Sequence, residues 1–194
     1  MSACAALEDA LGITVDGALR DLRLLLYCGE WIESHTLHIH FLHAPDFLGV
    51  DSGVELAALD RAAVERGLDV KRIGNLILET IGGRAIHPVN IRVGGFYRVP
   101  TRRELDPLRA ELVQGLEAAI EIVHWVAGFD FPDQESGHEL VAADHPTEYP
   151  MLADRIISDR GLDIPVHEFL DHVEEHQVAH STALHACLLY TSDA

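Results

Sequence analysis

The chain has 194 residues, 48% of them hydrophobic, and a formal net charge of −18 from 14 Lys and Arg against 32 Asp and Glu. This length suits one domain with a sizeable core and is short for two. The acidic balance argues against nucleic acid, which requires clustered basic side chains, and favours protein partners. No apolar run reaches the roughly 18–20 residues of a membrane span, and no signal peptide opens the chain, so we expect a cytoplasmic protein.

Apolar residues at helical spacing predict a chain rich in helices. We expect helices over residues 3–11, from about 17 to 44 after a cap at Asp16, and from about 53 to 66 after a cap at 51–53. Two more are expected from about 69 to 80 and from about 102 to 126. Pro45 is expected to end the long second helix. The last helix begins with capping-box spacing between Thr101 and Glu104, and its predicted buried stripe is Leu108, Leu112, Leu116, Ile120 and Val123.

The period changes toward the end of the chain. Residues 139–142 and 155–158 are predicted to be short strands, and His167–His176 a short acidic helix. Residues 178–186 are predicted to be a loop or a strand. The expected fold class is therefore mainly α with a small β portion, α+β.

The segment from His35 to Asp46 carries four of the thirteen histidines, His35, His38, His40 and His43. Such a density is typical either of core histidines satisfied by hydrogen bonds or of residues that handle protons, metals or electrons. On a regular helix the first two share one face and the last two another, so the four rings do not converge on one ion. The cysteines, Cys4, Cys28 and Cys187, form no CxxC pair and predict neither a disulfide framework nor a metal site.

The segment 82–96 contains the run GGRAIHPVNIRVGG, in which two glycine pairs bracket Arg84, His87-Pro88 and Arg92. Glycine pairs permit close backbone approach, so this loop is predicted to lie against another group. An ordinary connection between a helix and a strand is the alternative, although it explains the glycines better than the charged residues.

The last eight residues, CLLYTSDA, correspond to one reading frame of a transposon-derived sequencing adapter. We therefore interpret residues 1–186 as the biological domain and residues 187–194 as sequencing-adapter read-through.

Several of these segments together resemble the large (alpha) subunit of nickel-iron hydrogenases. The similar segments are SACAALEDALGI, IESHTLHIHFLHAPDFLG, GGRAIHPVNIRVGG, HPTEYPM, SDRGLDIPV and EEHQVAHSTALHA. The resemblance runs from Ser2 to about Ala186 and is greatest to the cytoplasmic, multimeric, NAD(P)-linked, sulfhydrogenase-like branch.

The resemblance implies the incomplete long-helix bundle of such subunits and a role in reversible dihydrogen oxidation. In the family, electrons pass to the iron-sulfur clusters of a small subunit, then through diaphorase-type subunits to NAD(P) or ferredoxin. Four cysteines in two CxxC pairs hold nickel and an iron with cyanide and carbonyl ligands. Neither pair is in this chain, so it is expected to be an internal fragment that holds no metal and is inactive alone, with Met1 just downstream of the first pair.

The resemblance also assigns residues. Ser34, His35 and His38 match positions around the metal centre, and Ser34 stands where the membrane-bound branch has Asp. Arg84 and His87 match loop residues that face the nearest iron-sulfur cluster of the small subunit. His40 and His43 are expected to face neighbouring helices and to serve packing.

Two alternatives stay open. The quinone-side subunit of respiratory complex I shares this fold and a similar loop but has lost the metal cysteines. A metal-free binding or scaffold module is the other.

Overall fold

The structure is a computed structural model that describes residues 1–135, 137–152 and 154–189. The chain divides into two compact units, residues 1–132 and residues 133–194. The first is built of helices with one short hairpin, and the second mainly of short strands, so the predicted α+β class is confirmed. None of the described helices is long and apolar enough to cross a membrane.

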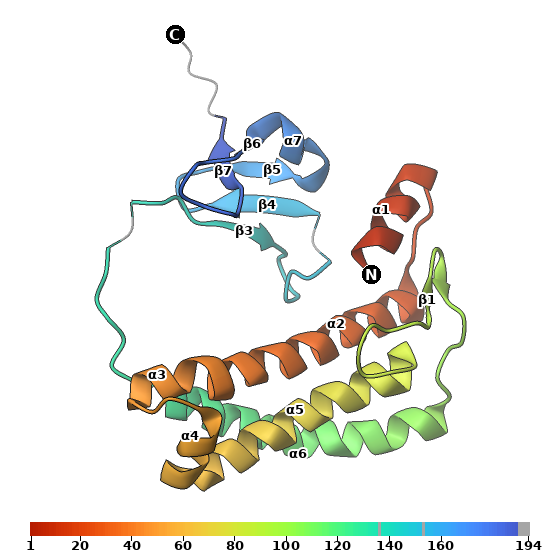
Figure 1. The fold of residues 1–194 in the computed structure, drawn as a ribbon. Helices are drawn as coiled ribbons and strands as arrows, with labels where there is room; N and C mark the ends of the chain where they lie inside the picture. Colours follow the sequence, from red (N-terminus) through yellow and green to blue (C-terminus); the bar gives the residue numbers. More distant parts are fainter. Residues whose placement is uncertain (136, 153, 190–194) are drawn as a thin grey trace. The chain divides into compact units, whose positions relative to one another are not determined.

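The first unit is organised around three long helices. Its helical elements are α1 (Ser2–Leu11), α2 (Gly17–Leu37), the π-helical turn η1 (His38–His43), α3 (Ala44–Leu48), α4 (Gly53–Leu59), α5 (Arg61–Gly82) and α6 (Arg102–Val126). The strands β1 (Ile91–Arg92) and β2 (Gly95–Phe96) form an antiparallel hairpin between α5 and α6. Helices α2, α5 and α6 run side by side, and α5 packs against both of the others (Figure 1).

The core of this unit lies where these helices meet. Its buried side chains are Leu26, Ile77, Leu78, Ile81, Phe96 and Leu108. Two glycines let α2 and α5 approach closely. A Cβ atom on Gly29 would lie 2.7 Å from Cγ2 of Ile77, and one on Gly74 would lie 2.6 Å from the backbone nitrogen of Glu33. Both distances are too short for a normal contact, so this close packing depends on glycine at both positions.

The break between the third and fourth predicted helices lies elsewhere than expected. Helix α5 is continuous through Gly67, and the break falls at Asp60, whose Oδ1 accepts a hydrogen bond from the N–H of Ala63 at 3.0 Å. Gly67 stays helical because the ring of His40 packs directly on it. A Cβ atom there would lie 2.6 Å from Cγ of His40. The glycine that indicated a helix end is therefore a site of close approach.

The long second helix also differs from the prediction. It does not end regularly at Pro45 but passes through the π turn η1 into α3, in which Pro45 occupies the first turn. Proline is accommodated there because the first N–H groups of a helix have no partner within the helix. Asp16 precedes α2 as predicted, but its side chain accepts no capping hydrogen bond.

Helix α6 begins at the predicted capping box, in which the N–H of Thr101 donates to Oε2 of Glu104 at 2.8 Å. Its buried face is not the predicted stripe. Leu108 and Ile122 are buried, and a Cβ atom on Gly115 between them would lie 2.5 Å from Cδ1 of Ile73 on α5. These three positions are spaced by seven residues and share a face, whereas steps of four residues drift away from it because a turn takes about 3.6 residues.

The far end of the predicted stripe is therefore exposed. Val113, Leu116, Ile120 and Val123 follow one another at helical spacing and are between 49% and 66% exposed. Helix α6 thus carries a second apolar face, which no other described part of the first unit covers.

The second unit contains two small antiparallel sheets. Strands β3 (Val141–Asp144), β4 (Arg155–Ser158) and β5 (Asp163–Pro165) pair in that order, and β6 (Val173–His176) pairs with β7 (His185–Leu188). The strand at 155–158 is confirmed, and the one predicted at 139–142 is shifted to β3. The predicted acidic helix over 167–176 is wrong for most of its length, because only α7 (Phe169–His172), preceded by the 3-10 turn η2 (Val166–Glu168), is helical. Cys187 and Leu188 lie in β7, and residues 190–194 of the proposed read-through lie outside the described residues.

Candidate functional site

The C-terminal end of α2 presents two of the predicted site histidines in the same way. Nδ1 of His35 donates to the carbonyl oxygen of Trp31 at 2.8 Å, and Nδ1 of His38 donates to that of Ser34 at 2.7 Å. Because a carbonyl oxygen only accepts hydrogen bonds, Nδ1 carries a proton in both rings. In the neutral ring Nε2 is then the basic nitrogen, able to take up a proton or bind a metal.

Both rings lie at the surface of the described structure, and Ser34 between them is half-buried. The ring of His35 stacks on Trp31 with 5.2 Å between centroids. Beside Ser34, the carboxylate of Glu33 pairs with Nζ of Lys71 on α5. The predicted residues Ser34, His35 and His38 therefore lie together on one helix end that α5 holds in place.

His40 is the structural member of this histidine group. Its side chain is fully buried, stacks on Trp125 of α6 with 5.2 Å between centroids, and donates through Nδ1 to the carbonyl oxygen of Thr36 at 3.0 Å. Burial lowers the pKa of His40, so the ring is favoured in its neutral form. Its packing against Trp125 and Gly67 agrees with the expectation for this residue. His43 differs, because its side chain is exposed and faces His38.

The loop of the second predicted group is held in a defined shape. Nε of Arg84 donates to the carbonyl oxygen of His87 at 2.6 Å. His87 has a φ of 51°, a left-handed conformation that few non-glycine residues adopt. Both side chains are exposed, so the loop presents a guanidinium and an imidazole to the outside.

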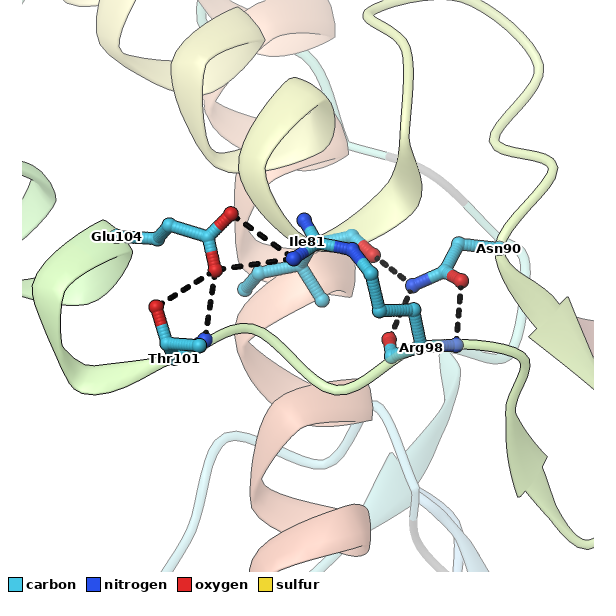
Figure 2. A network of polar contacts seen from close by, with 5 residues as sticks. All are labelled: Ile81, Asn90, Arg98, Thr101 and Glu104. Carbon is cyan, nitrogen blue, oxygen red and sulfur yellow. Dashed lines mark hydrogen bonds and ion pairs between the residues drawn. The ribbon is translucent and has the colours of Figure 1, made fainter.

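Asn90 ties this loop to the neighbouring helices, as Figure 2 shows. Its Nδ2 donates to the carbonyl oxygens of Ile81 at 2.8 Å and Arg98 at 2.6 Å, and its Oδ1 accepts from the N–H of Arg98. The guanidinium of Arg98 in turn bonds both carboxylate oxygens of Glu104 at 2.9 and 3.0 Å. The hydrogen bonds from Thr101, then that from Arg98, lower the pKa of Glu104 to about 2.

Sequence reasoning missed a buried ion pair that positions the hairpin. The guanidinium of Arg23 on α2 bonds both carboxylate oxygens of Glu8 on α1, and its NH2 also donates to the carbonyl oxygen of Arg92 at 3.0 Å. The other side of the hairpin is bound as well, since the N–H of Gly94 donates to Glu8 at 2.7 Å. Nothing in the local pattern marks these residues, because the partners come from three separate elements.

The two predicted groups lie at opposite ends of the α2–α5 pair. The loop end packs near the start of α2, where a Cβ atom on Gly95 would lie 3.3 Å from Leu19, and the histidine end packs on Gly67 near the start of α5. Leu19 and His38 are separated by about 28 Å along a helix with a rise of about 1.5 Å per residue. The structure therefore brings Ser34, His35 and His38 together, brings Arg84 and His87 together, and keeps the two groups apart.

No family model matches this chain. The chain is 30% identical over 188 residues to the alpha subunit of sulfhydrogenase 1 of Pyrococcus furiosus, which is 96% of this chain and 44% of that protein. It is 34% identical over 181 residues to the alpha subunit of sulfhydrogenase 2 of the same organism, with shares of 93% and 42%. Over 121 residues it is 35% identical to a subunit of the vhu F420-non-reducing hydrogenase of Methanocaldococcus jannaschii, with shares of 59% and 29%.

Among solved structures, the crystal structure of an NAD+-reducing [NiFe]-hydrogenase in the H2-reduced state matches with a TM-score of 0.77 at 20% identity, over 91% of this chain and 44% of that chain. At this identity the match shows a common fold. The homologues of the chain are thus hydrogenase alpha subunits, and the resemblance read from the sequence segments is confirmed. The chain spans less than half the length of the sulfhydrogenase subunits that it matches.

Proposed function

We propose that this chain, a homologue of hydrogenase alpha subunits, is part of the catalytic subunit of a nickel-iron hydrogenase. The reaction is the reversible oxidation of dihydrogen, with electrons passing to iron-sulfur clusters of a small subunit, then to NAD(P) or ferredoxin. The observation that carries the proposal is the similarity to two sulfhydrogenase alpha subunits over more than nine tenths of this chain. The complex I and scaffold alternatives gain no comparable support.

The residues of this chain do not form the metal site by themselves. Its cysteines, Cys4, Cys28 and Cys187, include no CxxC pair. In the ranges that the structure describes, no group of three or more His, Cys, Asp or Glu side chains is placed to hold a metal. We therefore assign the cysteine ligands to parts of the catalytic polypeptide outside this sequence, and expect the chain alone to bind no nickel-iron centre and to be inactive.

Ser34, His35 and His38 are proposed to line that centre. The hydrogen bonds from Nδ1 to backbone carbonyl groups fix the orientation of both rings, as is usual for histidines beside metal sites. Each neutral ring offers Nε2 as a proton acceptor, which heterolytic cleavage of dihydrogen requires. Ser34 adds a hydroxyl group to the same wall.

Arg84 and His87 are proposed to face the small subunit, close to its nearest cluster. Residues 83–103 contain five of the 14 basic residues of the chain, Arg84, Arg92, Arg98, Arg102 and Arg103, and no Asp or Glu. All five side chains are exposed. This basic stretch in a chain with a net charge of −18 suits the acidic surface of a partner protein.

The exposed apolar face of α6, Val113, Leu116, Ile120 and Val123, is proposed to pack against further helices of the longer subunit. Diaphorase-type subunits are proposed as further partners, and the cytoplasm as the location of the complex. We retain the proposal that the biological domain ends at about residue 186 and that residues 187–194 are adapter read-through.

The test is to produce the longer gene product with maturation factors and its small subunit, then measure bound nickel and dihydrogen-dependent reduction of a redox dye. We expect nickel and turnover in the unaltered protein. His35→Gln and Ser34→Ala should lower turnover with nickel retained, whereas His124→Gln, an exposed histidine on α6, is the matched control. A folded longer protein without nickel would refute the proposal.

A further inference from the structure

The π-helical turn η1 brings together two histidines that a regular helix would separate. A π turn forms hydrogen bonds from residue i to i+5, and such turns are often found at functional sites. His38 and His43 are five residues apart, and their rings stand nearly parallel, with centroids 6.1 Å apart and 26° between the planes. The extra residue in the turn therefore creates a pair of facing imidazoles.

Both rings are available to a solute. Their side chains are exposed, in contrast to the buried ring of His40. Nδ1 of His38 is engaged by the carbonyl oxygen of Ser34, which leaves Nε2 with a free lone pair in the neutral ring. His43 makes no hydrogen bond to another residue in the ranges that the structure describes, so either of its nitrogens is available. The packing of the first unit gives this pair no task.

We propose that His38 and His43 form a binding site for a divalent transition-metal ion of the Ni²⁺ or Zn²⁺ type. Imidazole nitrogen is a preferred ligand of both ions, and a ligating ring commonly donates its second N–H to a backbone carbonyl, as His38 does. Water supplies the remaining ligands, because no third protein ligand is placed there among the described residues.

The geometry permits both rings to bind one ion. Two metal–nitrogen bonds of about 2.0–2.1 Å each span at most about 4 Å between the two nitrogens. Rings with centroids 6.1 Å apart reach that separation when their nitrogen edges turn toward each other, which needs side-chain rotation only. With two protein ligands and open access, the site is expected to exchange its ion readily. It does not depend on the proposed hydrogenase function.

Two other histidine groups provide controls. His35 lies one turn before His38 and is exposed like it, but its ring is stacked on Trp31. His180 and His185 in the second unit contact each other edge to face, with centroids 5.4 Å apart. If the metal prefers that pair, substitution of His185 and not of His43 will abolish binding.

The experiment titrates the untagged 194-residue chain with NiCl₂ and with ZnCl₂ in a calorimeter, with folding of each variant checked by circular dichroism. We expect one ion per chain, affinity reduced about tenfold or more in His38→Ala and in His43→Ala, and no change in His35→Ala. Three results would overturn the proposal. These are no binding at about 1 mM free metal, equal binding by all three variants, or loss of binding in His185→Ala alone.

Discussion

The guanidinium of Arg23 meets the carboxylate of Glu8 in a two-point contact, at 2.5 and 2.7 Å, with both side chains almost completely removed from solvent. The same two residues also bond the backbone of the β1–β2 hairpin at Arg92 and Gly94. One ion pair thus fixes α1, α2 and the hairpin that follows the Arg84–His87 loop.

Removing one partner of this pair should destabilise the first unit strongly. Glu8→Gln or Arg23→Met leaves a buried group without its counter-charge, which typically costs about 3–5 kcal/mol in the free energy of unfolding. Urea denaturation followed by circular dichroism measures this. The double variant should lose less than the sum of the single losses. Arg61→Met, which breaks the exposed pair with Glu65, is the control. Equal effects of Arg23→Met and Arg61→Met would contradict the structure.

The same pair predicts how stability depends on pH. The hydrogen bonds from Arg23 hold the pKa of Glu8 below its ordinary value of 4.5. A carboxylate with a lowered folded-state pKa stabilises the protein above the pKa of the unfolded state and loses this effect as pH falls through the folded pKa. The gap in unfolding free energy between the native chain and Glu8→Gln should therefore be full at pH 7 and shrink below pH 4.5. A gap that stays constant from pH 7 to about pH 3 would be inconsistent with this pairing.

Gly67→Ala tests the contact between α5 and the buried histidine. The added Cβ atom would lie 2.6 Å from the ring of His40, so ring or helix must shift. Overpacking of this kind typically costs about 1–3 kcal/mol, against the usual gain from replacing glycine in a helix. Gly137→Ala is the control, because nothing lies within 4 Å of its Cβ position. Thermal unfolding compares the two, and a stabilised Gly67→Ala protein would show that the ring does not pack there.

This contact also explains where sequence reasoning succeeded and failed for the fold. The helix start at Thr101 was predictable because a capping box is a local signal. Gly67 was interpreted as a break because its partner, His40, lies far away in sequence, and no local pattern reveals it. The π turn at His38–His43 was unpredictable for the same reason, since its extra residue is stabilised by tertiary packing of His40 against Trp125.

The two faces of α6 should respond differently to substitution. Leu108 is 2% exposed, and Leu108→Ala should cost about 2–5 kcal/mol through lost contacts and a cavity. Leu116 is 62% exposed, and Leu116→Ser in the 194-residue chain should change stability by less than about 0.5 kcal/mol. Chemical denaturation of both variants decides the matter. A large loss in Leu116→Ser would restore the stripe predicted from sequence.

His87→Ala in the longer enzyme should slow electron transfer while bound nickel is retained. An imidazole beside an iron-sulfur cluster donates a hydrogen bond that tunes its potential, and removal of the ring abolishes that donor. Turnover with redox dyes and metal analysis are measured together, with His124→Ala as the matched surface variant. Unchanged turnover would remove His87 from the proposed path.

The candidate site could be predicted only in part. The segments around His35 and Arg84 stand out in the sequence by composition and by resemblance, and the structure keeps each group together. The roles of the individual rings followed from contacts that spacing does not encode. A regular helix would set His43 on the same face as His40, whereas the π turn sets it opposite His38. The Glu8–Arg23 pair depends on contacts among three elements and gave no sequence signal.

The most direct test of the central claim is the genomic sequence on both sides of the codons for residues 1–194. If the chain is part of a nickel-iron hydrogenase catalytic subunit, one open reading frame will carry a CxxC pair within a few residues upstream of Met1. A second pair will lie near the end of the frame, downstream of the codon for Ala186. A longer frame that continues through both junctions without either CxxC pair would contradict the claim.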